Sequence, residues 1–117
     1  MKSTELRIGN YVYNFNKTIY QIIDGEDIDD CDRHKCFQRI PLTPEILENC
    51  GFDWSIYHQA HHKENFEFDL QKSYPTGWTL TTFKNGIIIA PNIQYLHQLQ
   101  NLIHSLTGEE LEINFNK

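Results

Sequence analysis

The sequence predicts an α+β fold: an N-terminal β-hairpin, a short helix, an antiparallel β-meander, a C-terminal amphipathic helix and a short final strand. Two patterns predict this class. Apolar residues alternate with polar ones in much of segment 65–90, as in half-buried strands, and they recur at helical spacing in segment 93–106. The 117 residues suit a single domain over 1–117, because this length buries one core but not two of comparable size.

The N-terminal hairpin is predicted from residue type. β-branched and aromatic residues are frequent in segments 6–15 and 18–23, and residues 14–17 between them suit a turn.

A short helix is expected to begin at Pro44 and to end before Gly51. Thr43 can cap it, because a threonine hydroxyl accepts a hydrogen bond from an orphan amide and proline is tolerated at the first helical position. The residues expected to pack on the core from this helix and just after it are Ile46, Leu47, Cys50, Phe52 and Trp54.

The meander is predicted from alternation and turn residues. Its expected strands are 66–71, 78–83 and 87–90, with turns at 74–77 and 85–86. We expect Pro91 to end the last strand and Asn92 to cap the helix that follows.

The C-terminal helix is expected from Ile93 to Leu106, with Gly108 in a left-handed cap. One half of this helix is apolar. The other half is unusual, because residues 85–108 contain no Asp, Glu, Lys or Arg, whereas a solvated helix face normally carries charge.

Three polar residues of this helix, His97, Gln100 and His104, form a ridge at spacing i, i+3, i+7. These side chains could simply lie at the boundary between the core and solvent. Alternatively, they could belong to a surface that a second copy or another protein covers. Catalysis by these histidines is disfavoured, because the sequence fixes no nucleophile or acid beside them. The predicted contact surface consists of His97, Gln98, Gln100, Asn101 and His104.

A small ligand is a second possibility for this binding surface. Tyr74, Trp78 or Tyr95 could stack the base of a nucleotide-like ligand. Core packing explains these aromatic residues equally well.

Two histidine and cysteine clusters favour an alternative function, a zinc-binding protein or a metal-dependent hydrolase. The candidate ligands are Cys31, His34, Cys36, His58, His61 and His62. The spacing from Cys31 to Cys36 is loose for structural zinc, so solvated loop residues are the competing interpretation. Cys50 is expected to be a core thiol. Zinc is the only cofactor that these residues suggest. The main expectation is that the protein binds no cofactor.

The net charge of -6 comes from one run of residues, 24–32, which holds six carboxylates and no base. The remainder is neutral, so nucleic-acid binding is disfavoured. The run lacks the ligand spacing of a calcium loop and is expected to be solvated. A role as a DNA mimic that occupies a nucleic-acid-binding protein stays open.

The sequence also indicates a location. Its longest apolar run, 87–90, is too short to span a bilayer, and no secretory signal follows Met1. Three cysteines form an odd set, so we expect reduced thiols in a cytoplasmic protein. No nucleophile-elbow, Walker, dinucleotide-binding or HExxH motif occurs, which favours a protein that is not an enzyme.

Three segments, 5–12 (ELRIGNYV), 40–47 (IPLTPEIL) and 95–102 (YLHQLQNL) with 106–111 (LTGEEL), resemble a family of small uncharacterised proteins of Bacteroidetes phages and mobile elements. The resemblance implies a gene context and no catalytic residues. Small phage proteins are often binders, so it favours a non-enzymatic, self-associating binding module that contacts a host or phage protein or sequesters a small ligand, in order to counter host defence.

Overall fold

The computed structural model describes residues 6–14, 16–23, 25, 37–56, 60–64, 66–73, 76–82 and 86–115. The chain forms two compact units, residues 1–41 with 95–111 and residues 42–94 with 112–117. The single domain over 1–117 stays a prediction. No helix in the described ranges is long and apolar enough to cross a membrane.

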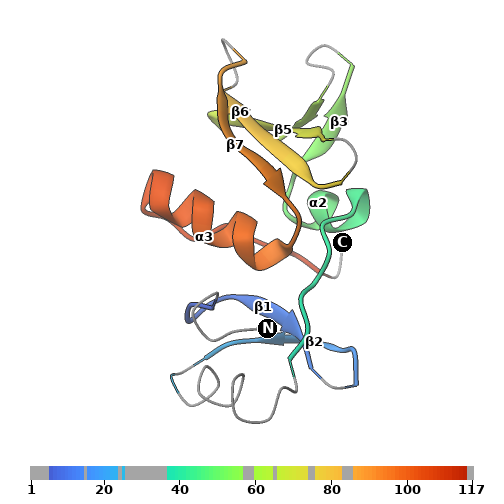
Figure 1. The fold of residues 1–117 in the computed structure, drawn as a ribbon, viewed down its shortest axis with the longest axis vertical. Coiled ribbons are helices and arrows are strands. Elements are labelled where there is room, and N and C mark those ends of the chain that lie inside the picture. Colours follow the sequence, from blue (N-terminus) through green and yellow to red (C-terminus); the bar gives the residue numbers. More distant parts are fainter. Residues whose placement is uncertain are drawn as a thin grey trace. The chain divides into compact units, whose positions relative to one another are not determined.

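The first unit contains the predicted hairpin and the C-terminal helix. Strands β1 (Tyr11–Tyr13) and β2 (Ile19–Gln21) are antiparallel, and helix α3 (Leu96–Thr107) contacts β1 (Figure 1). The residues buried in the hairpin and its flanks are Leu6, Val12 and Ile22, and those buried in the helix include Leu96, Leu99 and Ile103. The predicted N-terminal hairpin is therefore confirmed.

Helix α3 begins three residues later than predicted. The N-cap residue is Tyr95 and not Asn92, and the Tyr95 amide donates to the side-chain oxygen of Gln98 at 3.1 Å, as in a capping box. The expected end is confirmed: Gly108 has a φ of 76°, a left-handed conformation that glycine adopts without steric cost, and its amide donates to the His104 carbonyl.

The second unit is a five-stranded antiparallel meander preceded by helix α2 (Pro44–Asn49) (Figure 1). The strands follow one another in the sheet in chain order: β3 (Asp53–Ser55), β4 (Ala60–His62), β5 (Phe68–Lys72), β6 (Trp78–Thr82) and β7 (Ile88–Ile93). The predicted cap of α2 is confirmed, because the Thr43 hydroxyl accepts from the Ile46 amide. Strands β3 and β7 are the two edges of the sheet.

The structure differs from the predicted elements at three further places. Strand β7 continues through Pro91 to Ile93, which is possible because an edge strand tolerates a proline that donates no hydrogen bond. Strands β3 and β4 were not predicted, since three residues are too few to show an alternation. Residues 111–115 form no strand, although the amide of Asn114 donates to the carbonyl of Asn49.

Candidate functional site

Gln100, the middle residue of the uncharged ridge of helix α3, contacts the start of the hairpin in its own unit. His97 and Gln100 are each only 1% exposed. The side-chain oxygen of Gln100 accepts from the Tyr11 amide at 2.9 Å, and its nitrogen donates to the Gly9 carbonyl at 3.0 Å. Gln100 therefore completes backbone hydrogen bonds at the start of β1, and these contacts explain its lack of charge without an external partner.

Asn101 extends the same hydrogen-bond network. Its side-chain oxygen accepts from the Asn10 side chain at 2.7 Å and from Arg7 at 3.1 Å, and Asn10 is fully buried. His104 is half-buried and Gln98 is exposed at the cap. Contact of this helix with a partner stays a prediction, and its most buried polar residues have a structural role.

The predicted stacking residues are also in contact within the chain. Trp78 is 2% exposed, and its indole donates to the Leu42 carbonyl at 3.1 Å, so it is a core residue of the second unit. Tyr95 is stacked on His97, with the Arg39 guanidinium 5.3 Å from its ring centre. Tyr74 lies outside the described residues.

Most candidate metal ligands, Cys31, His34, Cys36 and His58, lie outside the described residues, as does nearly all of the acidic run 24–32. His61 and His62 are described, but as neighbours on β4 they point to opposite faces of the sheet. In the described part of the chain, no three His, Cys, Asp or Glu side chains converge on one point. The zinc alternative stays a prediction.

Cys50 behaves as the expected core thiol. It is buried at the end of α2, and desolvation raises the pKa of its thiol to about 12, although the charge of Lys63 acts in the opposite direction. The thiol is therefore protonated and unreactive at neutral pH.

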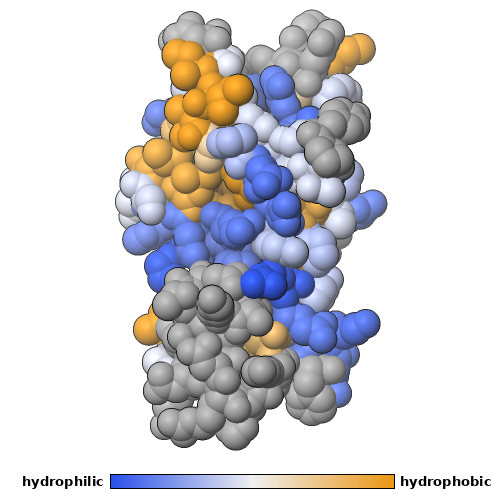
Figure 2. Space-filling model, in the orientation of Figure 1, coloured by the Kyte–Doolittle hydropathy of each residue, from blue (hydrophilic) through white to orange (hydrophobic). Residues whose placement is uncertain are grey.

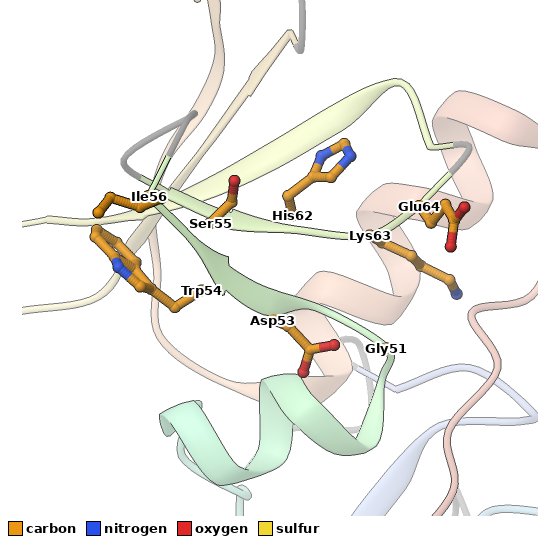
Figure 3. Close-up of a pocket in the computed structure, with 8 residues that line it drawn as sticks. All are labelled: Gly51, Asp53, Trp54, Ser55, Ile56, His62, Lys63 and Glu64. Carbon is orange, nitrogen blue, oxygen red and sulfur yellow. The ribbon is translucent and has the colours of Figure 1, made fainter.

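An open pocket of about 590 Å³ lies along β3 and the end of β4 (Figure 3). Figure 3 shows Trp54 and Ile56 together at one end, and Lys63 and Glu64 at the other. The pocket is lined by Gly51, Asp53, Trp54, Ser55, Ile56, His62, Lys63 and Glu64. It therefore offers an apolar end and a charged end along one edge strand.

Trp54 is the only aromatic residue that lines the pocket in the described part of the chain, and 61% of it is exposed. It was expected to pack on the core, as Phe52 does, and that expectation was wrong. Trp54 lies on the sheet face that buries Leu70 and Leu80, but β3 is the outermost strand of the sheet, so in the described structure no further strand lies beside it. Sequence spacing cannot reveal that a strand is at the edge of a sheet.

A turn at a glycine connects helix α2 to the edge strand β3. Gly51 has a φ of 91°, which lets the chain reverse from α2 into β3. A Cβ atom at this position would lie 3.3 Å from the Lys63 side chain. The turn thus brings the α2–β3 junction close to Lys63 at the charged end of the pocket.

The charged end contains two acids and one base. The ammonium group of Lys63 lies 6.0 Å from the ring centre of Phe52 and 5.8 Å from that of Phe66, so its charge is near aromatic faces. Asp53 and Glu64 are exposed. The exposed charge around the pocket is therefore predominantly negative.

A row of polar side chains lies on one face of the sheet. Asp53, His62, Asp69 and Thr81 are direct cross-strand partners from β3 to β6. The Nδ1 atom of His62 is 2.6 Å from a carboxylate oxygen of buried Asp69, and this hydrogen bond fixes the orientation of the imidazole beside the pocket.

His61 lies on the opposite face, between the two tryptophans. Its ring centre is 5.6 Å from that of Trp54 and 5.1 Å from that of Trp78, and its buried Nδ1 makes no hydrogen bond in the described structure. Burial lowers the pKa of His61, although the charges of Glu48 and Asp53 oppose this effect. The folded protein therefore favours a neutral His61.

This preference predicts a pH dependence of stability. When the pKa is lower in the folded than in the unfolded state, the unfolded state binds the extra proton, so stability is lost as pH falls below about 6.5, the usual histidine pKa. His61→Phe should lose less stability over this range than the wild type. Urea unfolding of both proteins at neutral and mildly acidic pH measures the difference, and identical pH profiles would contradict this role of His61.

Comparisons of the chain with protein-family models, curated proteins and solved structures gave no match.

Proposed function

We propose that this protein is a non-enzymatic binding module that holds an extended segment of a partner protein in the pocket along β3. The observation that supports this proposal most is Trp54, a large aromatic residue exposed in a pocket with a charged rim. Tryptophan is enriched among the residues that dominate binding at protein interfaces, where a polar rim surrounds an apolar centre.

The position of β3 favours an extended ligand. In the described structure β3 pairs with β4 on one side and with no strand on the other. An added peptide strand can hydrogen-bond to such an edge while its side chains enter neighbouring pockets. Because β3 has only three residues, most of the affinity would come from Trp54 and Ile56 and little from the backbone.

The charge of the pocket favours a particular peptide composition. Asp53 and Glu64 are exposed, whereas the ammonium of Lys63 is close to two aromatic rings. The preferred segment therefore combines an apolar side chain, placed against Trp54, with a Lys or Arg close to it in sequence.

Selection from a displayed library of random short peptides tests this proposal. We expect peptides of that composition to bind the wild type, and Trp54→Ala to weaken their binding by about 30-fold, the usual loss at an interface anchor. Ile8→Ala is the matched control, because it truncates an exposed apolar residue in the other unit. Failure to select any peptide, or equal affinity for Trp54→Ala and the wild type, would refute the proposal.

A further inference from the structure

Three side-chain rings form a row on one face of the sheet, from the core of the second unit to its edge strand β3. His61 is the direct cross-strand partner of Trp54, and its ring also contacts Trp78. Both contacts are edge to face, with interplanar angles of 66° and 88°. Aromatic pairs favour this geometry. The row therefore connects the exposed anchor of the pocket to a buried indole.

Trp78 is the fixed end of this row. Its indole is almost fully buried and donates to the Leu42 carbonyl, and the Lys72 ammonium lies 5.0 Å from its ring centre. Trp54 is the exposed end, and in the described part of the chain its ring contacts no ring other than that of His61. The orientation of Trp54 thus depends on His61, and that of His61 depends on Trp78.

His61 contributes a ring to this row and no hydrogen bond. Its Nδ1 atom is buried and makes no hydrogen bond in the described structure, and burial lowers the pKa of the side chain, which favours the uncharged ring. The contact with Trp54 is therefore a contact between rings. Phenylalanine can replace the imidazole in such a contact, whereas a side chain without a ring cannot.

The opposite edge of the sheet is built differently. Figure 2 shows hydrophobic residues gathered over β7, among them Ile87 and Ile88, which are more than half exposed. Strand β7 contains no aromatic residue, and its register shifts against β6 and its Pro91 protect it from an added strand. Among the described strands, a row of rings that leads from the core to an edge occurs only at β3.

We infer that His61 is a positioning residue of the pocket: it holds the Trp54 indole in the orientation that receives the apolar side chain of the peptide. This inference rests on the proposed function. Immobilising an exposed side chain on binding costs conformational entropy, and the cost is smaller when a neighbouring ring already holds that side chain. His61 does not line the pocket, so it raises the affinity through Trp54 and not through contact with the peptide.

Fluorine nuclear magnetic resonance of protein labelled with fluorotryptophan tests the position of Trp54 without a ligand. The chain has two tryptophans, so two resonances are expected, and Trp54→Phe identifies one of them. Both should be broad in the wild type. His61→Val removes the ring but suits a strand, so the Trp54 resonance alone should narrow, because an exposed side chain that is not held changes rotamer within nanoseconds. His61→Phe should keep the wild-type line width.

The Trp78 resonance reports whether each variant is folded. A narrow Trp54 resonance in the wild type, an equally broad one in His61→Val, or a narrow one in His61→Phe would overturn the inference. If the valine variant is unfolded, His61→Thr decides the question, since threonine also suits a strand and lacks a ring. Ile8→Ala, a change in the other unit, should leave both resonances as in the wild type.

Peptide affinity then shows whether His61 acts through Trp54. His61→Val should weaken a selected peptide by about 5-fold, and His61→Phe should stay within about twofold of the wild type. Trp54→Ala has no indole to position, so adding His61→Val to it should cause no further loss. The same loss in both backgrounds would overturn the inference. If no peptide is selected, the proposed function fails, while the fluorine spectra still decide how Trp54 is held.

Discussion

Gln100→Leu should lower the free energy of unfolding by about 2–4 kcal/mol. Leucine has a similar volume, so the loss arises from hydrogen bonding and not from a cavity. Gln100 is almost fully buried. Its side chain accepts a hydrogen bond from the Tyr11 amide and donates one to the Gly9 carbonyl, two backbone groups at the start of β1. Removing a partner from a buried polar group costs its desolvation energy, which is larger than the net gain from an ordinary hydrogen bond.

The control for this change lies half a turn away on the same helix. Gln98 is exposed, and its side-chain oxygen accepts from the Tyr95 amide at the start of the helix, so Gln98→Leu should cost about 1 kcal/mol or less. Urea unfolding followed by circular dichroism measures both variants. If the two cost the same, Gln100 does not have the structural role described above, and an external partner becomes the better explanation of the uncharged ridge.

Phe52→Ala should lower the free energy of unfolding by about 3–5 kcal/mol, because it removes a fully buried ring and leaves a cavity. Phe52 links α2 to the sheet: its amide donates to the Leu47 carbonyl, and its ring packs edge-on against Phe66 at 5.6 Å. It also lies close to the Lys63 ammonium at the charged end of the pocket.

Trp54→Ala is the matched comparison, since it removes a larger aromatic ring two residues along the chain. Because Trp54 is mostly exposed, this change should cost far less stability than Phe52→Ala, while it abolishes most peptide binding. Thermal unfolding of the two variants separates the roles. A comparable loss of stability in both would show that Trp54 has a packing role, as first expected from the sequence.

Sequence reasoning succeeded where a local signal specifies the structure. Thr43 followed by Pro44 predicted the start of α2, and Gly108 predicted the end of α3, because caps depend on the chemistry of one or two residues. The hairpin and the central strands β5 and β6 followed from residue type and alternation. These features require no knowledge of distant contacts.

The candidate site could not be predicted in the same way. The exposure of Trp54 depends on β3 being an edge strand, and the burial of Gln100 depends on a hairpin about ninety residues earlier in the chain. Both are long-range properties. The absence of charge in 85–108 is visible in the sequence, but the same pattern occurs both in a helix face covered by its own chain and in an edge strand that is exposed.

The central claim, that the pocket along β3 binds an extended peptide, is tested most directly by nuclear magnetic resonance. A selected peptide is added to isotopically labelled protein, and the amide and indole shifts are followed. We predict that the largest changes occur at residues 51–56 and 62–64, with the Trp54 indole among them. Changes confined to β7 or to α3, with the Trp54 indole unmoved, would contradict the claim.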